Sequence, residues 1–499
     1  MKRFILRFIL AALLLPGAAS CSKWLEATSS SQTSGDKLYG TRDGFHNAVA
    51  GVYLNLCSPY SHSSFIGWET VDIACWPYQE LATGTLRRIQ EHSYDNRPVA
   101  AQIWGCWQAL YQNISQINLT LRELERRRDV ISSDIEYRLI RGEMLGLRAY
   151  LHFELIRLFG PAGWTGELAG KMTVPYATVY SKEPPRQRTA AETAQLLLDD
   201  VEESLRLLSL SDPLVADLPE SFENSINADG FWNYRQSHFN YFAAEALAAR
   251  IHLWDGNHGE AARCAQDVID RAFDCGLVSW VDAEEQRMKT NNDEKDWTFS
   301  TEHIFRIQAN STLFEDAPSE FLMPSDPSKG LLLGNSLVDN ILYVRLDPVT
   351  GSMAGAEDLR GPSWMLRFAG SGYQSYKLYS TSTSRREYRH LRPLIRISEM
   401  YYIVAEKRLQ DGDTPGALGL LNTVRLHRGI SDDLPDTADG WDELTKEYYR
   451  EFINEGQVFP FLKRTGCTHM ISGTTPVTPK DLIFPFPSSE IIYGRVQER

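Results

Sequence analysis

The strongest constraint in this sequence is a helical spacing of apolar residues that recurs along most of its 499 residues. In residues 136–159 the apolar positions follow steps of three and four, which places them on one side of an α-helix. Gly160 and Pro161 then end that helix. Strands do not alternate along the chain in a comparable series, so the sequence predicts a mainly α-helical protein. The same rhythm predicts further helices over residues 104–124, 190–208, 239–254 and 396–410.

Two of these helices begin segments that repeat one another. Gly256 lies seven residues after Ala249 and five before Ala261, and Gly412 has the same separations from Ala405 and Ala417. A helix, a glycine turn and a second helix with a small residue at the crossing are typical of tetratricopeptide repeats. We therefore predict a tetratricopeptide-like scaffold of helix pairs, with partner helices over 259–273 and 414–428. Two unrelated helical hairpins are the alternative.

The first twenty residues have the features of an export signal. Positive charges at Lys2, Arg3 and Arg7 precede an apolar run over 8–15, which is too short to span a bilayer. Small residues then lead to Cys21, and this Ala-Ala-Ser-Cys run resembles a bacterial lipobox, in which the cysteine sulfur is acylated. We expect residues 1–20 to be removed and the lipid on Cys21 to anchor the chain in a membrane. Ordinary cleavage that leaves a free Cys21 is the alternative.

The remaining chain divides by composition. Residues 21–40 include a run rich in Ser and Thr and predict a lipidated flexible tether. One large domain over 41–499 follows, with a helical N-terminal part over 41–215 and a C-terminal part over 216–499. Residues 279–392 are rich in Gly, Pro, Ser, Asp and Asn and are too long for a simple loop. We expect this insert to form compact irregular structure, so that long irregular loops decorate the helical scaffold.

Composition and motifs point away from several function classes. The formal net charge of −14 is unfavourable for binding nucleic acid through a basic face. Common catalytic motifs such as GxSxG, the P-loop, GxGxxG and HExxH do not occur. The six cysteines beyond Cys21 show no CxxC spacing and predict isolated buried thiols. We therefore expect no enzyme, no cofactor and no metal.

Charged residues at three places in the sequence are candidates for catalysis or metal binding. The pairs Asp199-Asp200 and Glu202-Glu203 predict a solvated helix face rather than a glycosidase dyad. Glu143 and Arg148 are expected to form a structural ion pair or to be surface charges. A calcium site at Asn291, Asp293 and Asp296 is disfavoured because an EF-hand loop needs a glycine and a terminal glutamate.

Short motifs follow one another from Cys21 to the C-terminus. In chain order they are FHNAVAGVY at 45–53, Trp107 to Asn118, Gly142-Glu143 with LRAY at 147–150 and LFG at 158–160, RISEMYY at 396–402 with Ala405-Glu406, Leu421-Asn422 with Arg425, Arg450-Glu451 with Glu455-Gly456, and FPFP at 484–487. Their order and spacing after a lipobox resemble the SusD/RagB family of Bacteroidetes outer-membrane lipoproteins. The sequence departs from this family at Pro460 and Phe461, where the family more often has an F-D-L-x-R run.

The resemblance implies a non-enzymatic nutrient binder, lipid-anchored in the outer membrane and facing the exterior. Such proteins cover a SusC-type TonB-dependent transporter, capture oligosaccharides or, in some members, peptides, and deliver them to the barrel. The implied partners are thus a SusC-like transporter and an oligosaccharide or peptide. A tetratricopeptide-type lipoprotein adaptor for a protein partner is the alternative, and an exported hydrolase has no supporting residues.

Aromatic residues, 11% of the chain, indicate where a sugar could bind. A flat ring covers the apolar face of a sugar, and Asp, Asn, Arg or Gln beside it can bind hydroxyls. Exposed rings on irregular segments are therefore the candidates, while Trp107, Tyr111 and Phe242 fall on helical apolar stripes and are expected in the core. The alternative is that the rings pack the loops onto the helices. We predict ligand contacts from Trp68, Asp72, Trp76, Tyr78 and Arg87. A second candidate site is formed by Trp280 and Trp297, and a third by Phe231-Trp232.

Overall fold

The structure is a computed structural model. It describes residues 35, 37–60, 65–75, 77–81, 83–308, 314, 316–326, 330–343, 354–471 and 476–493. Cys21, Trp76, the predicted signal and most of the predicted tether lie outside the described residues. Within the described part, no helix combines the length and apolarity that crossing a bilayer requires.

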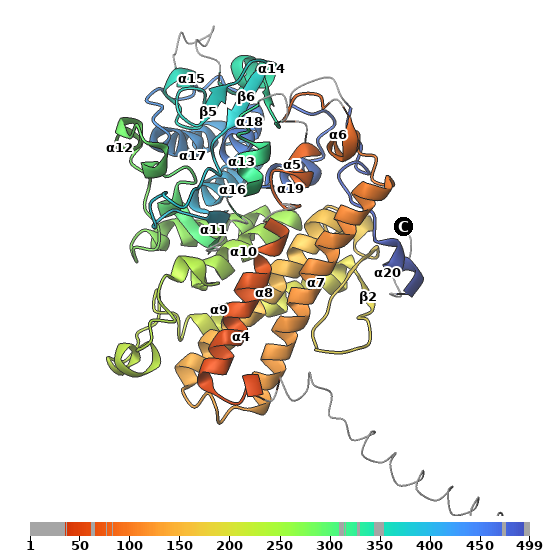
Figure 1. The fold of residues 1–499 in the computed structure, drawn as a ribbon, viewed down its shortest axis with the longest axis vertical. Helices are drawn as coiled ribbons and strands as arrows, with labels where there is room; N and C mark the ends of the chain where they lie inside the picture. The colour runs from red at the N-terminus through yellow and green to blue at the C-terminus, as the bar shows by residue number, and fades with distance from the viewer. Residues whose placement is uncertain are drawn as a thin grey trace, which may run out of the picture.

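The scaffold is a continuous series of packed helices, in which each helix contacts the next (Figure 1). This arrangement confirms the mainly α-helical, tetratricopeptide-like fold, and the predicted helices lie within one or two residues of their expected ends, except that α7 begins seven residues earlier. In packing order the helices are α4 (Arg42–Leu56), α7 (Arg97–Arg126), α8 (Asp134–Phe159), α9 (Ala190–Leu208), α10 (Tyr241–Trp254), α11 (His258–Ala272), α16 (Ile397–Gln410) and α17 (Thr414–His427), and α18 (Gly440–Phe452) packs on α16 and α17.

The two repeated turns have the backbone that their sequence requires. Gly256 and Gly412 have φ angles of +76° and +79°, a conformation that glycine adopts without strain. The alanines Ala261 and Ala417 are fully buried where each second helix packs on the first. The α10–α11 and α16–α17 pairs are therefore built alike, as the repeated spacing predicts.

Short strands and single helical turns complete the fold, many of them within residues 279–392. The strands form antiparallel pairs: β1 (Met172–Pro175) with β2 (Gln187–Thr189), and β3 (His303–Gln308) with β7 (Leu391–Arg396). A three-stranded sheet has the order β4 (Leu333–Gly334), β6 (Gly372–Ser375), β5 (Leu366–Phe368). The other α-helices of the described residues are α5 (Thr70–Ile73), α6 (Gly84–Gln90), α12 (Ala283–Met288), α13 (Asp316–Phe321), α14 (Asn335–Leu337), α15 (Ala354–Glu357), α19 (Val458–Thr465) and α20 (Ser488–Tyr493).

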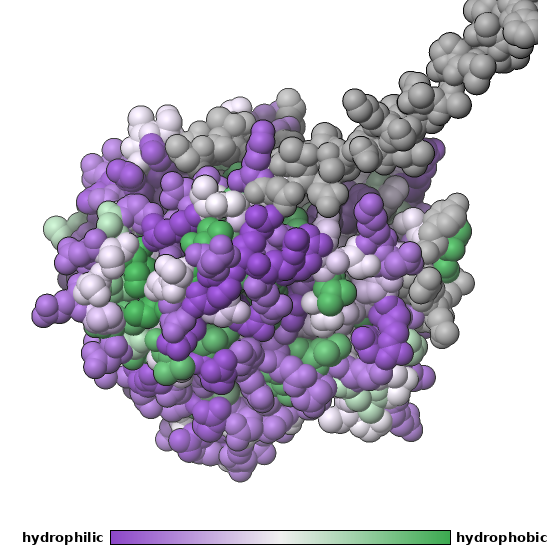
Figure 2. Space-filling model, turned by 90° about the horizontal axis from the view of Figure 1, so that it is seen from below, coloured by the Kyte–Doolittle hydropathy of each residue, from purple (hydrophilic) through white to green (hydrophobic). Residues whose placement is uncertain are grey.

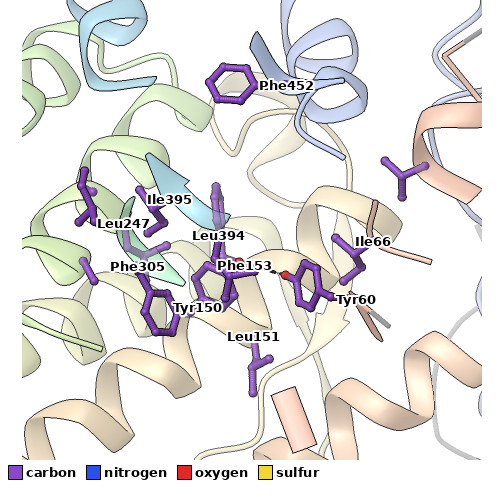
Figure 3. Packing of buried hydrophobic residues seen from close by; sticks show 14 of the residues in the cluster. Tyr60, Ile66, Tyr150, Leu151, Phe153, Leu247, Phe305, Leu394, Ile395 and Phe452 are labelled. Carbon is purple, nitrogen blue, oxygen red and sulfur yellow. Dashed lines mark hydrogen bonds between the residues drawn. The ribbon is translucent and has the colours of Figure 1, made fainter. Parts of the chain in front are cut away.

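The hydrophobic core extends from the long helices into the β3–β7 pair (Figure 3). Tyr150 of α8 packs edge-on against Phe305 of β3, with ring centroids 5.9 Å apart, and its hydroxyl lies 3.0 Å from that of Tyr60. Strand β3 inside the irregular insert and strand β7 at its C-terminal end are thus fixed in the core. On the face that Figure 2 shows, by contrast, apolar residues form small patches separated by polar ones.

A buried carboxylate, Glu451 of α18, holds the insert on the helices. It accepts hydrogen bonds from Arg360 at 2.9 Å, from Arg396 at 2.5 Å and from Arg428 at 2.6 Å. None of these four side chains is more than 1% exposed. We call them the Glu451 cluster. It joins the segment before β5, the end of β7, the end of α17 and α18.

Neighbouring acids balance the remaining positive charge of the cluster. Arg360 also pairs with Asp358 at 2.8 Å and with Glu447 at 2.7 Å, and Arg428 pairs with Glu302 at 2.6 Å. Burial alone would raise the pKa of Glu447, but Arg360 and Arg450 lower it to about 2. Because this pKa lies below its unfolded value, the stabilisation is present above pH ~4.5 and is lost as the pH falls toward ~2.

We expect Glu451→Gln to lower the free energy of unfolding by about 3–5 kcal/mol, because it removes the one carboxylate that three buried arginines share. Urea unfolding at neutral pH measures this. The matched control is Asp442→Asn on the same helix, whose carboxylate is 58% exposed and pairs with Lys446. That change should cost less than about 1 kcal/mol. Equal effects of the two substitutions would contradict the role of the cluster.

A second buried carboxyl, Asp72 of α5, is held in its neutral form. Its Oδ2 accepts the backbone N–H of Asn454 at 2.5 Å, while Oδ1 has no partner in the described part of the chain. Burial raises the pKa of Asp72 to about 8, although Asn454 and Lys377 act in the opposite direction. Folding therefore retains a proton that the unfolded chain releases, and the contribution of Asp72 to stability falls as the pH rises from ~4 to ~8.

Asp72→Asn should remove this contribution, since an amide keeps the acceptor without titrating. We expect the variant to gain stability relative to the parent chain on going from pH ~5 to pH ~9. Thermal unfolding of both proteins at these two pH values measures the difference. A gap between the two melting temperatures that does not change with pH would show that Asp72 is ionised in the folded chain.

Candidate functional site

The segment with most of the predicted ligand residues lies largely in the interior. Trp68 is 1% exposed and packs against Phe321, and Tyr78 is 3% exposed. The Tyr78 hydroxyl donates to the carbonyl of Trp68 at 3.1 Å and accepts from the side-chain amide of Asn454 at 2.8 Å. This corrects the expectation that Trp68 and Tyr78 are exposed on a loop. The described residues between them, 69–75 and 77, are buried too, among them the apolar Val71 and Ile73.

Arg87 stays at the surface, in a charged cleft of about 390 Å³ at the start of α6. Its guanidinium pairs with Glu80 at 2.6 Å and with Glu91 at 2.8 Å, and Arg88 pairs with Glu91 at 3.0 Å. The cleft therefore presents paired donors and acceptors rather than a net charge. Its lining residues are Glu80, Leu81, Thr83, Gly84, Arg87, Arg88 and Glu91.

The loop before this cleft continues the three-stranded sheet of the insert. Tyr78 forms an antiparallel bridge with Leu333 of β4. The backbone N–H of Gln79 donates to the carbonyl of Leu332 at 2.8 Å, and the side chains of Gln79 and Ser371 are hydrogen-bonded. A Cβ added at Gly372 would lie 2.6 Å from the carbonyl oxygen of Leu333, so only glycine fits there. We call the surface formed by residues 77–81, 83–91 and 366–379 the loop–sheet face.

The most exposed aromatic ring of the loop–sheet face is Phe368, at the end of β5. It is 60% exposed and contacts the ring of Tyr373 edge-on at 5.5 Å. The neighbouring Arg367 guanidinium lies 4.0 Å above the ring of Tyr376 and donates to Asn292 at 2.7 Å. Sequence reasoning missed Phe368, although the Ala-Gly-Ser-Gly run after it is typical of a hairpin turn that would display such a ring.

The two tryptophans of the second candidate do not come together. Trp280 stacks on His427, with ring centroids 4.3 Å apart, beside the end of α17. Trp297 is 3% exposed and packs against Trp364 and Tyr376, below β5. Trp297 therefore supports the loop–sheet face from within. In the third candidate Trp232 is internal, at 1% exposed, and Phe231 is half-buried and stacks on His46.

A larger groove of about 1140 Å³ runs between the first turns of α7 and residues 480–491. Its most exposed aromatic residue is Trp104, at 44%. Apolar side chains predominate in the lining, so the groove suits an apolar partner better than a sugar. They include Ala100, Ala101, Ile103, Ile483, Phe484, Pro485, Phe486, Pro487 and Ile491.

The acidic residues considered above for catalysis or metal binding form structural contacts. Asp200 is buried and pairs with Arg148 at 2.6 Å, which corrects the expectation of a solvated face at this position. Glu143 pairs with Arg235 at 2.6 Å and with His238 at 3.1 Å, and Asp293 accepts from the hydroxyls of Thr381 and Thr383. Across the described residues, no group of three or more His, Cys, Asp or Glu side chains could hold a metal ion.

The cysteines of the described chain are free. Cys57, Cys75, Cys106 and Cys264 are buried, as expected of isolated thiols. Cys275 is exposed and Cys467 half-buried, which corrects the expectation that all six are buried.

Comparisons with known proteins agree with this fold. Residues 43–220 match a SusD-like family described as starch-binding and associating with the outer membrane, and residues 366–477 match the SusD family. Among curated proteins, none matches this chain.

Solved structures share the whole architecture at low sequence identity. A SusD superfamily protein of Bacteroides thetaiotaomicron is 21% identical with a TM-score of 0.69, over 92% of this chain and 99% of that one. A SusD-like carbohydrate binding protein of Bacteroides vulgatus is 14% identical with a TM-score of 0.64, over 92% and 97%. A laminarin binding SusD-like protein is 19% identical with a TM-score of 0.56, over 92% and 99%.

The two family matches cover the N-terminal helices and the region of the Glu451 cluster, and the solved structures extend the likeness over most of the fold. The chain therefore belongs to the SusD/RagB family of glycan-binding proteins associated with the outer membrane.

Proposed function

We propose that this protein is a surface lipoprotein that captures oligosaccharides on the loop–sheet face and passes them to a SusC-type TonB-dependent transporter. The observation that carries the proposal is the exposed Phe368 ring on the same three-stranded sheet that the loop before the Arg87 cleft extends. The ring can cover the apolar face of a sugar, and the paired side chains of the cleft can exchange hydrogen bonds with its hydroxyls. Binding of this kind requires no catalytic step.

The construction of the loop–sheet face favours binding without large rearrangement. The bridge between Tyr78 and Leu333 joins the loop before α6 to the sheet. The hydrogen bond between the side chains of Gln79 and Ser371 reinforces this connection. Below the surface, Trp297 and Asn292 support β5. A site whose parts are already fixed spends less free energy on ordering loops when the ligand binds. In this proposal Trp68, Asp72, Tyr78 and Trp297 position the site, and Arg87 contacts the ligand.

The second candidate function is an adaptor that binds a protein partner. The apolar groove beside Trp104 favours it, because such a groove can receive apolar side chains of another protein. A peptide ligand in place of a glycan is a further possibility on the loop–sheet face.

A glycan array separates these functions. The soluble chain beginning at residue 22 is applied to immobilised oligosaccharides, with a peptide pool in parallel. The proposal expects selective binding to one class of glycan. Binding only to peptides, or to neither library, would contradict it.

Phe368→Ala should weaken binding of the glycan that the array identifies by about 1–2 kcal/mol, or roughly five- to thirtyfold in Kd. The melting temperature should hardly change, because the ring is mostly in solvent. Trp104→Ala is the matched control, since it removes an exposed ring from the apolar groove instead. If Trp104→Ala weakens binding and Phe368→Ala does not, the ligand binds in the groove.

The membrane anchor is tested separately. If Cys21 carries the acyl chains, Cys21→Ala should move the protein from the membrane pellet to the soluble fraction and abolish metabolic labelling with fatty acid. Cys467→Ala is a suitable control, because it removes another cysteine and leaves Cys21 in place. A Cys21→Ala protein that stays lipid-labelled in the pellet would contradict the lipoprotein assignment.

The transporter partner requires its own test. The full-length lipoprotein is purified in mild detergent from the cells that produce it, and associated proteins are identified by mass spectrometry. We expect a TonB-dependent barrel to be recovered. Repeated purification without such a barrel would contradict the partnership and leave glycan capture as a separate activity.

A further inference from the structure

A second polar cavity lies at the turn of the first helix repeat and shares no residue with the loop–sheet face. It has a volume of about 440 Å³, within the range of small-molecule sites. The α10–α11 turn forms one wall, and Glu406 and Gln410 of α16 lie on another. Arg464 at the end of α19 and Trp441 of α18 complete the lining together with residues 162–168. We call it the repeat-turn cavity.

Three residues lining this cavity hold buried polar atoms without a hydrogen-bond partner among the described residues. They are Nε1 of Trp254, Oδ1 of Asp255 and Nδ1 of His258. Trp254 is only 3% exposed, so its N–H donor is removed from bulk water. Buried polar groups are nearly always paired, and one donor and one acceptor left together at a cavity indicate a polar occupant.

Buried polar atoms without a hydrogen-bond partner among the described residues also line a smaller adjoining cavity. This cavity of about 30 Å³ shares Leu253, Trp254 and Arg464 with the larger one, and its volume suits a single water molecule. Nε of Arg157 and Nη1 of Arg250, both lining residues, also lack partners in the described chain. Water can satisfy the inner pocket, while the outer cavity has room for a larger ligand.

The charges around the repeat-turn cavity disfavour an anionic occupant and leave acceptors for a ligand that carries hydroxyl groups. Both terminal nitrogens of Arg464 bind the buried Glu406, one of them at 2.7 Å, so neither charge is left unbalanced. His258 lies 3.7 Å from Glu406, and burial lowers its pKa, which keeps the ring neutral at pH 7. Asp255 adds one acceptor, and burial raises its pKa. A strong anion would find no free positive charge among these groups.

We propose that the repeat-turn cavity is a second saccharide site, sized for one or two sugar rings. Sugar hydroxyls both donate and accept, so one can accept from Nε1 of Trp254 while its neighbour donates to Oδ1 of Asp255. Trp441 is 37% exposed and offers a flat ring to the apolar face of the sugar. The inference stands on the chemistry of this cavity and does not require binding at the loop–sheet face.

Fluorine NMR tests the site directly. The soluble chain is labelled with 5-fluorotryptophan, and the Trp441 and Trp254 resonances are assigned with Trp441→Phe and Trp254→Phe. The probes are glucose, galactose, mannose and N-acetylglucosamine, each at up to ~0.1 M, which would fill even a millimolar site. We expect at least one sugar to shift both resonances with a common Kd. Absence of any shift would mean that the cavity holds only water and would overturn the proposal.

Two variants locate the binding. Trp441→Ala should raise that Kd about tenfold. Asp255→Ala should do the same, because it removes an acceptor of the α10–α11 turn. The Kd of the Asp255→Ala protein is read from the Trp441 resonance, in a chain whose melting temperature is unchanged. Phe368→Ala and Trp104→Ala should leave it unaltered, so failure here is distinguishable from failure at the loop–sheet face. An unchanged Kd in both Trp441→Ala and Asp255→Ala would place the sugar elsewhere and contradict the assignment.

Discussion

The fold depends on the neutralisation of one fully buried carboxylate. Glu451 forms ion pairs with Arg360, Arg396 and Arg428, which belong to three separate segments of the sequence. Each guanidinium would be costly to bury alone, and so would the carboxylate, so the segments are stable only together. The consequence reaches the surface: Arg360 lies six residues before β5, and Phe368 ends that strand. An interaction in the interior thereby sets where an exposed ring is displayed.

The helical part of this architecture is predictable from sequence because its signal is local. The spacing of apolar residues predicts both ends of α9. The positions of Gly256 and Gly412 identify two equivalent helix pairs. Burial of the ligand candidates was not predictable in the same way. Whether Tyr78 faces solvent depends on its partners Leu333 and Asn454, which lie hundreds of residues away. Asp200 was misplaced for the same reason, since its partner Arg148 belongs to another helix.

Several of the motifs that carry the family resemblance turn out to be structural. Arg396, Glu451 and Glu455 all belong to or contact the Glu451 cluster, and Arg450 pairs with Glu447 beside it. These residues preserve the scaffold and contain no information about the ligand. The candidate ligand residues Arg87 and Phe368 lie outside the motifs, on the short elements α6 and β5, which loops connect to the rigid scaffold. Such peripheral segments can vary in chemistry without loss of the fold. Fold and family were therefore readable from sequence, and the ligand was not.

The central claim is that glycans bind where residues 77–91 meet the three-stranded sheet of the insert. Hydrogen–deuterium exchange of the soluble chain, with and without the glycan identified on an array, tests it most directly. The account predicts slower exchange in peptides covering 77–91 and 366–379, because a bound ligand suppresses local opening of the segments it contacts. Protection confined to 92–104 and 480–491 would move the site to the apolar groove and contradict the account.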